Sequence, residues 1–128
     1  MDPSNPPPRA TILLVEDDDA QRATLTDILT SSGYHVLPAR GASEAHQAGK
    51  HHRGPIDLLI ADVVMPGVWG PELALDLAVS QPNMKLLYIS GYGQDAIGSF
   101  DSSTPFLQKP FSAAKLVGKV QEVLGEPG

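Results

Sequence analysis

Short apolar segments alternate with amphipathic segments along the chain, and this alternation constrains the fold more than any other feature of the sequence. Near-continuous apolar runs are typical of strands that are covered on both faces. They predict strands at residues 11–15, 34–37, 56–61, 85–89 and 106–107. Apolar residues at helical spacing predict helices at 20–32, 43–52 and 72–79, and a last helix that follows Ser112. Residues 94–103 are the hardest to interpret, and we expect one short helix at most.

Glycine, proline and serine residues mark where these elements begin and end. Gly33 follows the first helix in the usual C-terminal position. Ser43 and Ser112 are expected N-caps, because a serine hydroxyl accepts a hydrogen bond from the first helical turn. Pro71 suits the first turn of its helix, where a missing N–H costs nothing.

Strands that are separated by helices pair in parallel, with right-handed crossovers and helices on both faces of the sheet. The pattern therefore predicts a doubly wound α/β fold with a five-stranded parallel sheet. Its simplest strand order is 2-1-3-4-5, which is the flavodoxin-like order. In such sheets, ligands bind beyond the carboxyl ends of the strands.

The length of 128 residues fits one domain. We place the domain at residues 10–125. Residues 1–9 contain four prolines and no apolar run, so we expect a disordered leader there. Residues 126–128 are expected to form a loose C-terminal end.

Composition excludes several classes of function. The net charge of −6, with nine Lys and Arg in total, argues against a nucleic-acid-binding surface. The absence of cysteine excludes disulfides and thiolate chemistry, and it fits a cytoplasmic location. No apolar stretch is long enough to predict a membrane span.

Polar residues with complementary chemistry follow four of the predicted strands. Glu16 and Asp17 follow the first strand, Asp62 the third, Ser90 the fourth and Lys109 the fifth. Carboxylates that share a site resist ionisation unless a cation is present, and Mg²⁺ prefers such oxygen ligands. A carboxylate can also act as the nucleophile in phosphoryl transfer. The set predicts a site for a divalent cation and a phosphoryl group, with Asp62 as the acceptor.

Each of these features alone has a simpler interpretation. An acidic cluster such as 16–19 is usually a solvated turn, and one of Asp18 and Asp19 is expected to cap the first helix. Asp62 alone would be a turn residue, and Lys109 alone a surface lysine. Chance does not place all of them at strand ends together, so the joint arrangement favours the functional interpretation. For Trp69 we leave open whether it contacts a partner or covers the site locally.

Four segments of the chain resemble the signature segments of response-regulator receiver domains. They are Val15-Glu16-Asp17-Asp18, Asp62-Val63-Val64-Met65-Pro66-Gly67, Ile89-Ser90-Gly91 and Lys109-Pro110-Phe111. They occur in the family's order at similar intervals, and together they cover nearly the whole folded chain. The resemblance implies a phosphoacceptor in a two-component phosphorelay, which receives its phosphoryl group from phosphohistidine.

The resemblance also implies how the phosphoryl site is built. Asp62 would be the phosphoacceptor, and Lys109 would form an ion pair there. Asp17, Asp62 and the backbone carbonyl of Val64 would bind Mg²⁺, for which Mn²⁺ can substitute. Glu16 would act through a water.

Further implied roles concern the response to phosphorylation. Ser90 would donate its hydroxyl to the phosphoryl group, and Phe106 would be the aromatic switch residue. The peptide bond before Pro110 would be cis, as X-Pro bonds can be at modest cost.

Two details refine the family prediction. Val64 and Tyr92 occupy the positions that tune the lifetime of the phosphorylated state, and neither orients an attacking water well, so we predict slow self-dephosphorylation. Segments 88–92 and 106–111 resemble receivers attached to hybrid sensor histidine kinases. The region between Gly93 and Phe106 is short, so we expect a reduced helix and an atypical output face there.

Two other functions compete with the phosphoacceptor. A Mg²⁺-dependent phosphohydrolase with an aspartyl-phosphate intermediate would need a second acid at position 64, which is valine. A degenerate receiver, acting as a constitutive binding module, would not need Glu16, Asp17, Asp62, Ser90 and Lys109.

The expected partners are a histidine kinase or a histidine phosphotransfer domain, with an unspecified downstream protein. We expect no enzymatic activity beyond self-phosphorylation from small donors and self-dephosphorylation. A homodimer, and the choice between a stand-alone regulator and a fragment of a hybrid kinase, are left open.

Overall fold

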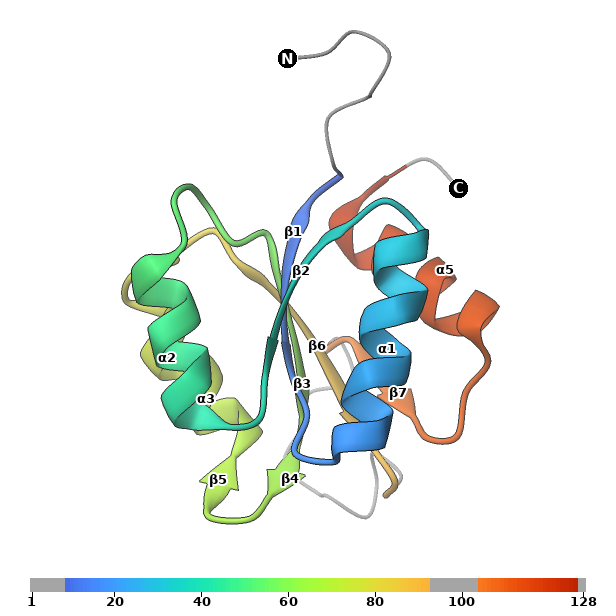
Figure 1. The fold of residues 1–128 in the computed structure, drawn as a ribbon, viewed down its shortest axis with the longest axis horizontal. Helices are drawn as coiled ribbons and strands as arrows, with labels where there is room; N and C mark the ends of the chain where they lie inside the picture. The colour runs from blue at the N-terminus through green and yellow to red at the C-terminus, as the bar shows by residue number, and fades with distance from the viewer. Residues whose placement is uncertain (1–8, 93–103, 127–128) are drawn as a thin grey trace, which may run out of the picture.

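The computed structural model describes residues 9–92 and 104–126 (Figure 1). Residues 1–8, the expected short helix at 94–103 and residues 127–128 lie outside this part of the chain. From the N-terminus, the elements are β1 (Thr11–Val15), α1 (Asp19–Ser31), β2 (His35–Ala39), α2 (Ala42–His51), β3 (Leu58–Asp62), β4 (Val64–Met65), β5 (Val68–Trp69), α3 (Gly70–Ala78), β6 (Lys85–Ser90), β7 (Phe106–Gln108) and α5 (Ala113–Leu124).

Five strands form one parallel sheet in the order β2-β1-β3-β6-β7. Counted along the chain without the short β4 and β5, this is the order 2-1-3-4-5, and the predicted doubly wound fold is confirmed. β4 and β5 form a small antiparallel hairpin that the sequence did not predict. A two-residue strand is too short to show an apolar periodicity.

Two hydrophobic cores lie on opposite faces of the sheet. On one face, Leu13 and Val15 of β1 pack in a cluster with residues of α2 and α3. On the other face, Ile12 and Leu14 of the same strand pack in a cluster with residues of α1 and α5. Figure 1 shows the two helix pairs on either side of the sheet. Because successive side chains of a strand point to opposite faces, burial on both faces explains the continuous apolar run at 11–15.

Some element boundaries differ from the predicted ones. Ser43 is not an N-cap: α2 begins one residue earlier, and its N-cap is Gly41 without a side-chain hydrogen bond. The Glu44 carboxylate accepts a hydrogen bond from the backbone N–H of Arg40 at 2.9 Å, which satisfies a donor just before the helix. α1 is capped by Asp18, which accepts a hydrogen bond from the backbone N–H of Gln21 at 2.8 Å, as predicted for one of the two aspartates.

Strand β3 begins at Leu58, two residues later than predicted. The two residues before it are held by side chains. The N–H of Ile56 donates to Oε1 of Gln81 at 3.0 Å, and Oδ2 of Asp57 accepts from the N–H of Thr11 at 2.8 Å. Asp57 therefore takes a hydrogen bond at the amino end of β1 that a backbone carbonyl would otherwise accept.

The chain is also tied together at the amino edge of the sheet. The Tyr34 hydroxyl donates to Oε1 of Glu126 at 2.6 Å, just beyond α5. The guanidinium of Arg9 lies 5.4 Å from the centre of the Tyr34 ring, within the range of a cation–π interaction. Among the helices of residues 9–92 and 104–126, none is long and apolar enough to cross a membrane.

Candidate functional site

The carboxyl ends of the central strands meet at one edge of the sheet, the lower edge in Figure 1. Asp62 is the last residue of β3, and Ser90 is the last residue of β6. Glu16 and Asp17 follow β1 directly, and Lys109 follows β7. The topology thus brings the predicted site residues to neighbouring strand ends, as expected for a doubly wound sheet.

Glu16 lies completely buried at this edge, with 0% of its surface exposed. Its Oε1 lies 2.5 Å from Nζ of Lys109, and its Oε2 accepts a hydrogen bond from the N–H of Asp18 at 3.2 Å. Burial raises the pKa of the Glu16 carboxyl, although the hydrogen bond and the charge of Lys109 oppose this shift. A nearby positive charge therefore stabilises the ionised form of this buried carboxyl group.

Lys109 connects Glu16 to the predicted phosphoacceptor. Its Nζ also donates to Oδ2 of Asp62 at 2.9 Å. Burial alone would lower the pKa of Lys109, but the hydrogen bonds and the charges of the two carboxylates outweigh it and raise the pKa. The side chain therefore stays a cation at neutral pH.

The backbone at Lys109 is fixed as well. Its N–H donates to the carbonyl oxygen of Ser90 at 2.7 Å, which joins β7 to β6 at the site. The peptide bond between Lys109 and Pro110 is cis, which confirms the prediction for this bond.

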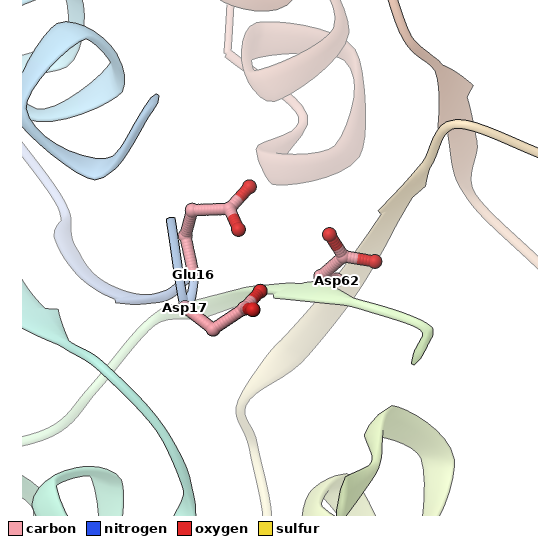
Figure 2. Close-up of side chains that lie close together, drawn as sticks. All are labelled: Glu16, Asp17 and Asp62. Atoms are coloured by element: carbon pink, nitrogen blue, oxygen red, sulfur yellow. The ribbon is translucent and has the colours of Figure 1, made fainter. Parts of the chain in front are cut away.

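Three carboxylates gather beside this ion pair. One oxygen each from Glu16, Asp17 and Asp62 lies within 4.8 Å of the others, and Figure 2 shows the three side chains together. Asp17 is exposed to solvent, whereas Asp62 is buried, with 8% of its surface exposed. The cluster has hard oxygen donors, part of it open to solvent, and Lys109 supplies only one positive charge to balance three carboxylates. These residues therefore fit a divalent cation such as Mg²⁺ or Mn²⁺.

Oδ1 of Asp62 accepts a hydrogen bond from the N–H of Val64 at 3.2 Å. Together with the contact to Lys109, both carboxylate oxygens of Asp62 have a partner, which fixes the orientation of the side chain. A fixed carboxylate with an adjacent cation is suited to nucleophilic attack on a phosphoryl group.

Ser90 ends β6, and the two predicted tuning residues, Val64 and Tyr92, lie two residues after Asp62 and two residues after Ser90. Ser90 is buried, and its Oγ accepts a hydrogen bond from the N–H of Tyr92 at 3.0 Å. The side chains of Tyr92 and Val64 are 63% and 48% exposed. Both predicted tuning residues therefore present large side chains to solvent.

Phe106 lies opposite Tyr88 at the start of β7 and packs, partly buried, against the core on the α2 and α3 face. This is the position predicted for the switch residue, and its movement stays a prediction. Trp69, for which two interpretations were open, packs locally against the same core.

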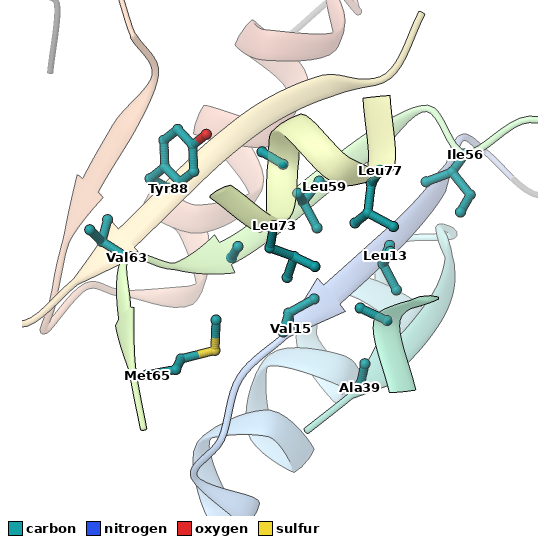
Figure 3. Close-up of a cluster of buried hydrophobic side chains, with 13 residues drawn as sticks. Leu13, Val15, Ala39, Ile56, Leu59, Val63, Met65, Leu73, Leu77 and Tyr88 are labelled. Atoms are coloured by element: carbon teal, nitrogen blue, oxygen red, sulfur yellow. The ribbon is translucent and has the colours of Figure 1, made fainter. Parts of the chain in front are cut away.

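The loop after Asp62 is anchored by alternate side chains. Val63 and Met65 are buried in the core on the α2 and α3 face, where Figure 3 shows them in one cluster with Val15, Leu73 and Tyr88. Val64, between them, faces solvent. The buried side chains of Val63 and Met65 thus anchor the loop to the core, while the side chain of Val64 remains exposed to solvent.

The sequence did not predict the contact of Arg22 with the site. Nη1 of Arg22 donates to the carbonyl oxygen of Glu16 at 3.0 Å, and its Nη2 forms an ion pair with Asp19 at 2.5 Å. Arg22 thereby ties the first turn of α1 to the acidic loop. The spacing of three residues from Asp19 was a signal for the ion pair, but not for the contact with Glu16.

A doubly wound parallel sheet, with buried acids and a lysine at the carboxyl ends of its strands, defines an α/β domain of the receiver type. The chain belongs to the response regulator receiver domain family, whose model matches residues 12–121.

Similar proteins include kinases and free regulators. The chain is 40% identical over 118 residues to the sensor kinase CckA of Brucella abortus, covering 90% of this chain but 12% of the kinase. It is 34% identical to the response regulator receiver protein CpdR of the same organism, covering 88% of this chain and 95% of CpdR.

A solved structure of the receiver domain from the hybrid histidine kinase CckA has a TM-score of 0.77 and 36% identity, covering 90% of this chain and 99% of that one. The resemblance to hybrid-kinase receivers is confirmed.

Proposed function

We propose that the chain is a phosphoacceptor in a two-component phosphorelay and that Asp62 carries the phosphoryl group. The observation that supports this most is the bridge from Lys109 to both Glu16 and Asp62, beside an acidic cluster at the carboxyl ends of the strands. The proposed donor is a phosphohistidine on a histidine kinase or a histidine phosphotransfer domain. Relatives of this chain occur in both a sensor kinase and a regulator, which is consistent with such partners.

In the proposed reaction, an oxygen of Asp62 attacks the phosphorus atom of the donor. The new O–P bond forms as the P–N bond of phosphohistidine breaks, and the imidazole nitrogen keeps the bonding electron pair. Lys109, held 2.9 Å from Oδ2, stabilises negative charge on the transferred group. The product is a mixed anhydride between the Asp62 carboxyl and phosphate.

The carboxylates of Asp17 and Asp62 and the backbone carbonyl of Val64 would hold Mg²⁺ or Mn²⁺, and Glu16 would act through a water. When bound, the cation supplies positive charge that offsets the charge of the acids and of the phosphoryl group. Lys109 contacts both Glu16 and Asp62, and this supports a site whose acids are already gathered before phosphorylation.

We further propose that Ser90 and Phe106 respond to the phosphoryl group. The Ser90 hydroxyl would donate to a phosphoryl oxygen, and the Phe106 ring would move inward as the end of β6 shifts. Ser90 is buried beside β3, and Phe106 begins the strand next to β6, so the two lie on adjacent strands. The output would then be a changed surface for a downstream protein.

The competing functions have less support. The phosphohydrolase would use an acid at position 64, where the chain has an exposed valine. A constitutive binding module would have no use for the bridge that Lys109 forms. The cytoplasmic location, domain limits at 10–125 and a signalling role without further catalysis stay parts of the proposal.

Incubation with Mg²⁺ and acetyl phosphate, followed by intact mass, tests the function. The wild-type protein should gain one phosphoryl group, and Asp62→Asn should gain none. Asp76→Asn is the matched control, because Asp76 is exposed on α3, and it should be labelled like the wild type. Labelling that survives in Asp62→Asn would overturn the proposal.

A further inference from the structure

Gly70, the first residue of α3, lies buried against the backbone of the predicted phosphoacceptor. A Cβ atom placed on Gly70 would lie 2.7 Å from the carbonyl oxygen of Asp62. It would also lie 3.2 Å from Cα and 3.3 Å from the carbonyl oxygen of Val63. All three neighbours are backbone atoms, so no flexible side chain can move aside for an added methyl group.

Position 70 requires glycine because an added side chain would meet neighbouring backbone atoms, and not because the backbone has an unusual conformation there. The glycines with positive φ in the described chain are Gly33, Gly54, Gly67 and Gly125, and Gly70 is not among them. Gly70 also donates its N–H to the carbonyl oxygen of Val63 at 2.8 Å. A side chain at position 70 would therefore strain or break a close hydrogen-bonded contact rather than a turn.

This contact closes the loop that leaves Asp62. The hairpin of β4 and β5 pairs Val64 with Trp69 and Met65 with Val68, and Gly70 follows it directly. The chain thus leaves β3 at Asp62, turns at the hairpin and returns to the backbone it has just left. The loop begins at Asp62, which is the proposed phosphoacceptor and a proposed metal ligand.

We infer that Gly70 is a positioning residue for the proposed phosphoryl transfer, because its missing side chain lets α3 fix the backbone from Asp62 to Val64. That backbone determines two features of the site, namely the N–H of Val64 that donates to Oδ1 of Asp62 and the direction of the Val64 carbonyl. The inference rests on the proposed function.

The displacement that a methyl group imposes is large for such a site. Ordinary contact begins at 3.4 Å, so the 2.7 Å approach would have to open by about 0.7 Å. Reactive groups must be held within about 0.5 Å of their working geometry, and misplacement by about 1 Å can cost on the order of 100-fold in rate. Gly70→Ala should therefore alter cation binding and phosphorylation more than it alters the fold.

The test compares Gly70→Ala with Gly118→Ala and the wild type. Gly118 lies in α5 with nothing within 4 Å of an added Cβ, so its alanine variant controls for the change of glycine to alanine in a helix. Two readouts are recorded per folded molecule. One is the rate of labelling by acetyl phosphate over a range of Mg²⁺ concentrations, and the other is Mg²⁺ binding.

Mg²⁺ binding is followed by the fluorescence of Trp69, the single tryptophan of the chain and the neighbour of Gly70. For Gly70→Ala we expect the half-saturating Mg²⁺ concentration to rise and the maximal labelling rate to fall, each by roughly tenfold. Gly118→Ala should match the wild type in both.

The folded fraction of each variant is measured by circular dichroism, with trimethylamine N-oxide added where a variant is partly unfolded. If folded Gly70→Ala binds Mg²⁺ and takes label like the wild type, the inference is wrong. If Gly70→Ala stays unfolded even in the osmolyte, Gly70 is a folding residue and the inference is equally overturned. Failure of the wild type itself to take label would instead count against the proposed function, and the Mg²⁺ titration would still decide the role of Gly70.

Discussion

Lys109 Nζ lies 2.5 Å from Oε1 of Glu16 and 2.9 Å from Oδ2 of Asp62, so one ammonium group bridges carboxylates from two strand ends. The side chain of Glu16 is 1% exposed and that of Lys109 18% exposed. Removing one member of such a buried arrangement leaves an uncompensated charge, which costs more than the net stabilisation of the intact pair.

Lys109→Met should therefore impair both stability and phosphorylation. We expect the free energy of unfolding to fall by about 1–3 kcal/mol, because Glu16 loses its buried partner. We expect labelling by acetyl phosphate to slow by roughly 100-fold, since a cation that stabilises the transferred group is lost. Urea unfolding and intact mass measure the two effects. Lys119→Met is the control, because Lys119 forms only a 3.6 Å surface pair with Glu122, and wild-type behaviour of Lys109→Met would contradict the role of the bridge.

The ion pair can be separated from simple packing by a double-mutant cycle. The unfolding free energies of Lys109→Met, Glu16→Gln and the double variant are compared with that of the wild type. Direct contact predicts a coupling of about 1–3 kcal/mol. Additive effects would show that the two side chains do not interact in solution.

Because of Tyr34, the free energy of unfolding is predicted to depend on pH in the alkaline range. Burial, followed by the hydrogen bond to Glu126 and the charge of Glu126, raises the pKa of Tyr34 to about 12. A raised pKa in the folded state means that the hydroxyl contributes stability below the unfolded pKa of about 10 and loses this contribution as the pH rises towards 12. The wild type should thus be more stable than Tyr34→Phe at pH 8, and the difference should shrink between pH 10 and 12.

Urea unfolding at a series of pH values measures this difference. Glu126→Gln removes the acceptor's charge but keeps a hydrogen-bond acceptor, so in that background the difference should still begin to shrink near pH 10 but should level off at a lower pH. A difference between the wild type and Tyr34→Phe that does not change with pH would contradict the assignment.

Asp57 is predicted to matter for stability but not for phosphorylation. Its Oδ2 accepts the N–H of Thr11 at 2.8 Å, so Asp57→Ala leaves a partly buried donor without this acceptor. We expect a loss of about 1–3 kcal/mol in unfolding free energy. Labelling per folded molecule should match the wild type, because Asp57 lies at the amino end of β3 and Asp62 at the other end. A labelling defect per folded molecule would show that Asp57 acts on the site.

Tyr92 and Val64 are predicted to lengthen the life of the phosphorylated state. Both are exposed, Val64 two residues after Asp62 and Tyr92 two residues after Ser90, and neither is expected to orient an attacking water. The phosphorylated protein should persist for many minutes or longer with Mg²⁺ present, and Tyr92→Ala should shorten this time severalfold. Loss of the label by the wild type within seconds would contradict the prediction.

The sheet and the site were predictable for the same physical reason. In a parallel sheet all strands point the same way, so residues that follow strands in the sequence meet at one edge. Glu16, Asp62 and Lys109 could thus be placed together although 46 and 47 residues separate them. The apolar runs needed no tertiary information, because β1 and β3 are buried on both faces.

Other features depend on contacts that no local pattern carries. The close approach of Gly70 to the backbone of Asp62 requires the path of the hairpin, which is too short to be recognised by periodicity. The hydrogen bond from the N–H of Thr11 to the carboxylate of Asp57 joins residues that lie 46 positions apart in the sequence. Gly41 rather than Ser43 is the N-cap of α2, and the Glu44 carboxylate accepts the hydrogen bond of the Arg40 N–H just before the helix.

The central claim is that Asp62 itself becomes phosphorylated, and hydride trapping tests it most directly. The protein is incubated with Mg²⁺ and acetyl phosphate and then treated with sodium borohydride, which reduces an acyl phosphate to the alcohol and releases phosphate. Peptide mass spectrometry then locates the reduced residue. We predict homoserine at position 62 and unmodified side chains at Glu16, Asp17 and Asp18. Reduction at one of these acids instead of Asp62, in protein that has taken up the label, would contradict the account.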